Sequence, residues 1–227
     1  MGNCLSGSRS DTANLRDLLD RPGVVDPQLS SDQIKEALGE VAKELEKKKH
    51  NVVIVAVGGA INTVLLGTRA STADVDFFGN GKGIPAELKA ATEAVTKKLG
   101  LAKGWLNNHT ALFINADKIE SLYDDAIKDN IVVFKKPGLT VLAAPWKYSL
   151  VAKVEKAGKG TAKPYDIKDA AGYLHQLIQA KKKKEPVKES ELKAWATEYR
   201  ATISQADIDK VAAEYKKQYA QDGIIKR

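Results

Sequence analysis

Asp74 and Asp76, in the stretch "STADVDFFG", are the two side chains of this 227-residue sequence best placed to do chemistry together. The valine and phenylalanines around them predict a strand, in which alternate side chains point to the same side. The two carboxylates then share one site, where they repel each other unless a cation lies between them. Mg²⁺ or Mn²⁺ suits such a pair, together with waters and substrate phosphates. The spacing predicts a cation site able to support phosphoryl or nucleotidyl transfer. The alternative is a purely structural pair.

A glycine turn precedes the aspartates. The β-branched run "NVVIVAV" predicts a strand that ends at Gly58 and Gly59, and "AINTVLLG" predicts a short apolar helix after it. Backbone N–H groups and the dipole at a helix N-terminus bind phosphate. Arg69, Ser71 and Thr72 lie between the helix and the aspartates and could donate to the same anion. The order strand, Gly-Gly, helix, Asp-Val-Asp strand is more restrictive than any one of its parts.

The remaining segments predict the elements that position these residues. Residues 31–50 and "PAELKAATEAVTKKLG" predict helices, and "TALFIN", "NIVVFKKPG" and "LTVLAAP" predict strands, with the helix "ADKIESLYDDAIKDN" between the first two. From residue 146 onward the pattern is helical. We therefore expect an α/β (α+β) fold with a small mixed sheet flanked by helices and a C-terminal helical region. The expected boundaries are a mobile arm over 1–30, the α/β core over 31–145 and the helical region over 146–227.

Composition excludes several classes of protein. No apolar run approaches the roughly 20 residues needed to cross a bilayer. One cysteine allows no internal disulfide framework, and three scattered histidines give no zinc-site spacing. The net charge of +7 favours a polyanionic partner, although the lysine runs at 46–50 and 180–188 also fit solvated helix ends.

The N-terminus "MGNCLSGS" carries a lipidation pattern. Gly2 becomes the first residue once Met1 is removed, Ser6 stands at the required position, and Cys4 lies beside them. One myristoyl chain binds a membrane only marginally, so palmitoylation of Cys4 would supply the second anchor. In a eukaryotic cell this predicts a cytoplasmic protein attached to a membrane surface, whereas a start that matches by chance predicts no acylation.

The stretch "VGGAINTVLLGTRASTADVDFF" resembles the polymerase-β-like nucleotidyltransferase superfamily, in particular its AbiEii-like branch. That branch has Gly-Gly, an apolar helix, and then Gly-X-Arg-X-Ser/Thr-X-Asp-hydrophobic-Asp. A later stretch, "LTVLAAPWKYSLVAKVEKAGKGTAKPYDIKDAAGYL", resembles its lysine on a helix followed by Asp-X-X-Asp at the start of the next helix. The resemblance covers residues 35–180. The matching positions are Gly58, Gly59, Gly67, Arg69, Thr72, Asp74, Asp76, Lys153, Asp166 and Asp169.

The resemblance implies a nucleotidyltransferase fold and a role for each matching residue. It implies that Asp74 and Asp76 are catalytic and hold Mg²⁺ or Mn²⁺, with Asp166 as a further catalytic group. The residues implied to bind the nucleotide are Gly58, Gly59, Arg69, Thr72 and Lys153. Apart from the resemblance, Tyr165 is a candidate for stacking on a base because it directly precedes Asp166.

The leading hypothesis is therefore a Mg²⁺-dependent nucleotidyltransferase that moves a nucleoside monophosphate from a nucleoside triphosphate to an acceptor, which could be RNA, protein or a small molecule. The alternative is an inactive nucleotide-binding or scaffold protein at a membrane. Ala60, where the wider superfamily has serine, and the lack of a third carboxylate in the predicted strands favour the alternative. A third hypothesis, nonspecific nucleic-acid binding, rests on charge alone and predicts a steep salt dependence.

Overall fold

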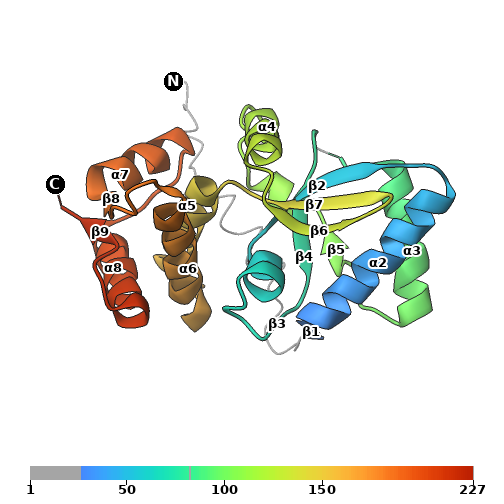
Figure 1. Cartoon of the computed structure of the whole chain (residues 1–227), viewed down its shortest axis with the longest axis horizontal. Coiled ribbons are helices and arrows are strands. Elements are labelled where there is room, and N and C mark those ends of the chain that lie inside the picture. The colour runs from blue at the N-terminus through green and yellow to red at the C-terminus, as the bar shows by residue number, and fades with distance from the viewer. Residues whose placement is uncertain (1–26, 82, 227) are drawn as a thin grey trace, which may run out of the picture.

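The computed structural model describes residues 27–81 and 83–226. Its centre is a five-stranded sheet in the order β5-β4-β2-β7-β6 (Figure 1). The strands are β2 (Val52–Val57), β4 (Val75–Phe78), β5 (Leu106–Asn107), β6 (Val132–Lys136) and β7 (Leu139–Ala143). β2 runs antiparallel to β4 and parallel to β7, while β4 and β5 are parallel. The mixed sheet expected from the sequence is confirmed.

Helices cover both faces of this sheet. Helix α2 (Ser31–Lys47) begins with a capping box between Ser30 and Gln33, and α3 (Ala86–Leu99) ends at Gly100 in the left-handed conformation. Alternate strand residues such as Val75 and Phe77 belong to the larger hydrophobic cluster, which also contains residues of α2 and α3. Phe78, of the opposite parity, belongs to a second cluster with residues of α4 (Ile119–Asp129). Alternation along β4 thus separates two cores.

Four helices complete the fold: α5 (Trp146–Ala157), α6 (Pro164–Ala180), α7 (Glu189–Glu198) and α8 (Gln205–Tyr219). They lie together at one side of the sheet, and α2 and α3 lie at the other (Figure 1). Two short strands, β8 (Val187–Lys188) and β9 (Ile224–Ile225), pair in parallel. No helix in the described part of the chain is both long and apolar enough to span a bilayer.

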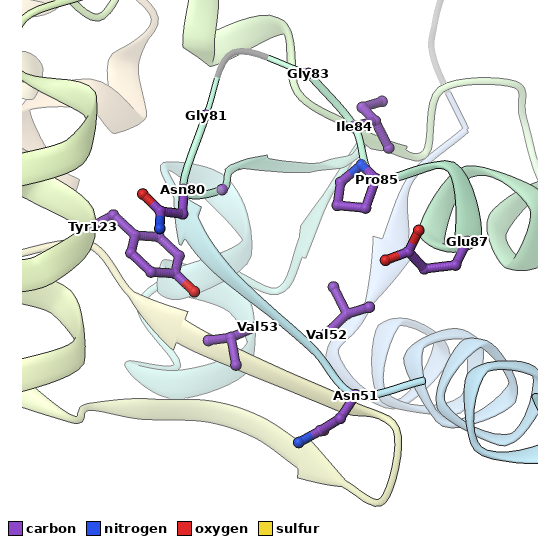
Figure 2. Close-up of a pocket in the computed structure, with 11 residues that line it drawn as sticks. Asn51, Val52, Val53, Asn80, Gly81, Gly83, Ile84, Pro85, Glu87 and Tyr123 are labelled. Atoms are coloured by element: carbon purple, nitrogen blue, oxygen red, sulfur yellow. The ribbon is translucent and has the colours of Figure 1, made fainter. Parts of the chain in front are cut away.

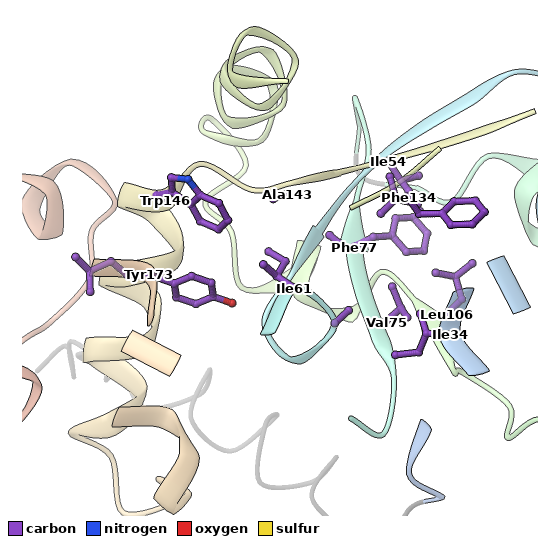
Figure 3. Close-up of a cluster of buried hydrophobic side chains, with 14 of the residues drawn as sticks. Ile34, Ile54, Ile61, Val75, Phe77, Leu106, Phe134, Ala143, Trp146 and Tyr173 are labelled. Carbon is purple, nitrogen blue, oxygen red and sulfur yellow. The ribbon is translucent and has the colours of Figure 1, made fainter. Parts of the chain in front are cut away.

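The helical region and the sheet share one hydrophobic cluster. Trp146 at the start of α5 stacks on Tyr173 of α6, with ring centroids 5.8 Å apart. Figure 3 shows Tyr173 pointing from α6 toward Ile61, which follows the glycine turn. All three belong to the same cluster as the interior of the sheet, so α6 packs directly against the segment that carries the glycines.

Two local predictions need correction. The segment "TALFIN" is not a strand: residues His109–Leu112 form the 3₁₀ helix η2, and Leu112 is 73% exposed. The side-chain oxygen of Asn107 accepts a hydrogen bond from the N–H of His109, which turns the chain there. The helix predicted after the glycines is a single π-helical turn, η1 (Ile61–Leu65), closed by an N–H of Leu66 that donates to the carbonyl of Ile61. Such turns are frequent at functional sites.

Residues 1–26 lie outside the described residues, so the predicted arm and the lipidation pattern at Gly2 and Cys4 are not described. The end of that predicted arm, Leu29–Ser30, is strand β1, which pairs with β3 (Ser71–Thr72). This small ladder holds the segment between Arg69 and Asp74 against the start of α2.

Candidate nucleotide site

The glycine turn at the end of β2 is held by two buried side chains. Gly58 has φ of 65°, which glycine adopts with little strain. Its carbonyl accepts hydrogen bonds from the Nδ2 of Asn62, at 3.0 Å, and from the hydroxyl of Tyr173, at 2.9 Å. Asn62 also donates to the Tyr173 hydroxyl, at 2.7 Å, and both residues are fully buried. Helix α6 therefore fixes the conformation of the turn.

Gly59 lies directly under two polar side chains. A Cβ at this position would come within 2.1 Å of the Oγ1 of Thr72 and 3.3 Å of an Nη1 of Arg69. Thr72 is only 5% exposed, and its hydroxyl lies against the glycine. A hydroxyl and a guanidinium N–H can both donate hydrogen bonds. Both donors face the glycine turn, which is an arrangement that suits an anion.

Arg69 is fixed by Asp169 from the other side of the site. Its Nε donates to one carboxylate oxygen of Asp169 at 3.0 Å, and its Nη2 donates to the other. Burial lowers the pKa of Arg69, but the hydrogen bond and charge of Asp169 outweigh burial and raise the pKa overall. Because Nε and Nη2 are both bound by Asp169, the third nitrogen, Nη1, lies on the edge of the guanidinium nearest Gly59. No described residue accepts a hydrogen bond from Nη1.

Lys153 completes a buried charge cluster with Asp166 and Asp169. Its Nζ lies 2.6 Å from an oxygen of Asp166 and 2.9 Å from an oxygen of Asp169, and both carboxylates are fully buried. Burial raises the pKa of Asp166, but the charge and hydrogen bond of Lys153 outweigh burial and lower it overall. With Arg69, the cluster holds two cations and two anions. The charge of Lys153 is therefore compensated within the protein.

The aspartate pair lies beside the glycine turn. Asp76 of β4 pairs with Val57, the residue before Gly58, so both features lie at the same end of the β2–β4 ladder. Asp74 precedes β4 by one residue, and both carboxylates are partly buried. The structure thus brings the aspartates, the glycines, Thr72 and Arg69 to one end of the sheet.

Asn107 of β5 faces the aspartates, and the sequence analysis did not identify it. It pairs with Asp76 in the sheet, and its Nδ2 donates to the Oδ2 of Asp74 at 3.2 Å and to the carbonyl of Gly104 at 3.0 Å. This amide is 5% exposed. The neighbouring strand therefore contributes a neutral donor beside the carboxylates, where a third carboxylate would increase the repulsion.

Within the described ranges, no three acidic, histidine or cysteine side chains form a group able to hold a metal ion. Asp166, which the resemblance implies to be catalytic, accepts hydrogen bonds from Lys153 and from the N–H of Lys163. Its catalytic role stays a prediction. Two carboxylates nevertheless fit a Mg²⁺ ion, since this ion keeps waters and takes its other ligands from substrate phosphates.

An open hollow of about 440 Å³ lies at the opposite end of the β2–β4 ladder (Figure 2). Val52 and Val53 of β2 face Asn80 across it, and Tyr123 of α4 closes one side. Glu87 is the charged group in its lining. The hollow contains none of the predicted site residues, and it lacks a described cation for a phosphate. We therefore assign the candidate site to the glycine end of the ladder.

Two further residues of the site are marked by a signal in the sequence. Asn62 is a polar residue inside the apolar stretch "AINTVLLG", and buried polar side chains usually have a hydrogen-bonding task. Tyr173 follows Asp166 by seven residues and Asp169 by four, which places all three on one face of a helix. No comparable signal marks Asn107, because a strand of two residues has no periodicity.

The fold and site define an α+β protein with a mixed five-stranded sheet and a polar site where α6 packs against its glycine turn. A family model described as a domain of unknown function, DUF7582, matches residues 27–222, so the chain belongs to this family. Comparison with curated proteins and with solved structures gives no match.

Proposed function

We propose that this protein binds a nucleoside triphosphate together with a divalent cation and that the site supports nucleotidyl transfer. The observation that carries the proposal is the convergence of the Thr72 hydroxyl and Arg69 Nη1 on Gly59, at the end of the ladder that holds Asp74 and Asp76. Two hydrogen-bond donors and two carboxylates thus lie at the same end of the sheet. A polyphosphate accepts hydrogen bonds from such donors, and its bound cation takes carboxylate ligands.

Each part of the site has a separate task in this proposal. The phosphates accept hydrogen bonds from Thr72 and Arg69, whose side chains approach Gly59 closely because that residue has no Cβ. Asp169 holds the guanidinium in place, so little rotamer entropy is lost on binding. Lys153 keeps Asp169 and Asp166 neutralised and positions the cluster.

Asp74 and Asp76 are the residues that would hold the cation. When bound, a divalent cation supplies charge neutralisation for the phosphates and for the charge that develops during transfer. The acceptor, whether RNA, protein or a small molecule, would approach the nucleotide at this end of the sheet. The resemblance to polymerase-β-like nucleotidyltransferases agrees with this assignment of residues.

A second candidate function is nucleotide binding without transfer, and Asn107 favours it. Its amide donates to Asp74 from the neighbouring strand, so the site has two carboxylates and a neutral group there. Two-metal transfer requires ligands for two cations about 4 Å apart. A site with fewer anionic ligands holds fewer cations, which suits a binding or scaffold protein.

Isothermal titration calorimetry tests the binding proposal. Wild type, Asp76→Asn and Asp125→Asn are titrated with the Mn²⁺ complexes of the four nucleoside triphosphates and with inorganic tripolyphosphate. Asp125 is a matched control because it is an exposed aspartate of α4, paired with Lys128. We expect metal-dependent binding by wild type and the control and its loss in Asp76→Asn. Wild type that binds none of these ligands would remove the proposal.

Pyrophosphate release separates transfer from binding alone. The assay uses each nucleoside triphosphate with Mg²⁺ and with RNA, protein or small-molecule acceptors. Release by wild type that Asp76→Asn abolishes supports transfer. If wild type binds nucleotide but releases no pyrophosphate, the variant Asn107→Asp tests whether the neutral amide at this position prevents transfer. Thermal unfolding then shows whether the variant is folded.

A further inference from the structure

Tyr165 presents an aromatic ring next to the proposed phosphate site. It is the second residue of α6 and is 40% exposed. The guanidinium carbon of Arg69 lies 3.6 Å from the centroid of its ring, and Lys153 Nζ lies 5.7 Å from it. An aromatic ring at a polar site is a candidate surface for a flat ligand group.

The position of this ring is fixed before any ligand binds. Pro164 precedes it at the start of α6, and Asp166 follows it, with one oxygen bound by Lys153 and the other by the N–H of Lys163. One face of the ring rests on Arg69, which is itself held by Asp169. Because its neighbours in the chain and Arg69 already restrict this side chain, it loses little conformational entropy when a ligand stacks on it.

The same guanidinium connects the ring to the glycine turn. One edge of Arg69, Nη1, points at Gly59, while its flat face lies on Tyr165. The phosphate site and the ring are therefore separated by the width of one guanidinium group. A nucleotide has the same order of parts, since its ribose separates the phosphates from a planar base.

We propose that Tyr165 is the surface on which the base of the bound nucleotide stacks, with little discrimination among the four bases. This inference rests on the proposed function and names the group that binds the other end of the ligand. The charged side chains around the ring already hydrogen-bond one another: Arg69 with Asp169, and Lys153 with Asp166 and Asp169. Stacking without hydrogen-bond readout tolerates any base.

The experiment compares nucleoside triphosphates with inorganic tripolyphosphate, which has the phosphates but no base. Wild type, Tyr165→Phe, Tyr165→Ala and Tyr123→Ala are titrated with the Mn²⁺ complexes of all five ligands. Tyr123 is the control, because it lines the hollow at the other end of the ladder. The thermal midpoint of each variant reports whether it is folded.

We expect Tyr165→Ala to weaken binding of each of the four nucleotides by about 5- to 150-fold, the range expected for one base–aromatic stack. Binding of tripolyphosphate should change by less than about twofold. Tyr165→Phe, which keeps an aromatic ring, should still bind nucleotides more tightly than tripolyphosphate, and Tyr123→Ala should behave as wild type does. In wild type, the four nucleotides should bind with similar affinities, each tighter than tripolyphosphate. This last comparison needs no variant.

Three results would overturn the inference. Equal weakening of tripolyphosphate and nucleotides by Tyr165→Ala would mean that the ring acts only by positioning Arg69. Wild type that prefers one base by more than tenfold would require hydrogen-bond readout. Wild type that binds tripolyphosphate but gains nothing from a base would reject stacking and leave the phosphate site intact, whereas failure to bind any of the ligands would reject the proposed function with it.

Discussion

Gly59→Ala is the most direct test of the geometry at the glycine turn. The φ angle of Gly59 is not positive, so an alanine fits the backbone conformation, and any effect must come from its side chain. That Cβ would lie 2.1 Å from Thr72 Oγ1 and 3.0 Å from Thr72 Cβ, where ordinary contacts begin at 3.4 Å. Thr72 would therefore have to move by more than 1 Å, although its backbone is held by β1.

Overpacking of this kind costs typically 1–3 kcal/mol. For a chain of this size, each kcal/mol lowers the thermal midpoint by roughly 2–4 °C. We expect Gly59→Ala to lower the free energy of unfolding by this amount and to displace the Thr72 hydroxyl, so that tripolyphosphate binding weakens as well. Differential scanning calorimetry and titration with Mn²⁺ tripolyphosphate measure the two effects on the same samples.

A double-mutant cycle identifies Thr72 as the cause. Thr72→Ala removes the atom at 2.1 Å but leaves the Cβ at 3.0 Å, so Gly59→Ala should cost less in this background without becoming neutral. Gly79→Ala is the control, because a Cβ there meets nothing within 4 Å and its φ is not positive. It should leave stability unchanged or raise it slightly. The reasoning is refuted if Gly59→Ala leaves the free energy of unfolding unchanged. It is also refuted if Gly59→Ala lowers that free energy by the same amount in wild type and in the Thr72→Ala background.

Three further predictions concern charge and modification. Lys153→Met should lower the free energy of unfolding at pH 7 by about 3–5 kcal/mol, because it removes the cation that the buried carboxylates of Asp166 and Asp169 share. In wild type the pKa of Asp166 is depressed below 3.8, so its contribution is lost only below that pH. In the variant, burial is opposed only by the N–H of Lys163 and the charge of Lys156, so the pKa of Asp166 should rise, and urea denaturation should show the stability deficit narrowing between pH 7 and pH 4.5. Burial, with Lys184, lowers the pKa of His175 below 6.5, so wild type should lose stability as the pH falls below 6.5, and His175→Phe should reduce that loss in the same assay. Metabolic labelling in a eukaryotic cell should place myristate on Gly2 and palmitate on Cys4, with both lost in Gly2→Ala; an unlabelled wild type would reject the lipidation prediction.

Local sequence patterns predicted most of the elements because their causes are local. The β-branched run before Gly58 and the apolar periodicity of α2 and α3 each specify their structure within one segment. The strand prediction for "TALFIN" was wrong because its composition is typical of a strand, whereas its conformation depends on a neighbouring residue. The N–H of His109 donates a hydrogen bond to the side chain of Asn107, and the chain turns there and forms η2. β5 was missed because it consists of two residues held by pairing with β4.

The candidate site was only partly predictable for a related reason. The glycines and aspartates lie within 19 residues of each other, so their order was visible in the sequence. The partner of Arg69 is Asp169, 100 residues further along the chain, and no local pattern pairs them. The resemblance to a known family marked Arg69 and Asp169 as matching positions. It did not indicate that two carboxylates neutralise the charge of Lys153.

Helix α6 explains why such a costly cluster is present. Buried ion pairs add little net stability, because desolvation offsets their attraction, but they hold geometry when every group has a partner. One face of α6 carries Asp166, Asp169 and Tyr173: the first two hold Lys153, Asp169 also holds Arg69, and Tyr173 holds the carbonyl of Gly58. Each contact fixes the glycine turn or the guanidinium beside it. The helical region therefore forms one wall of the candidate site, and a change in α6 should alter ligand binding even where no ligand atom touches it.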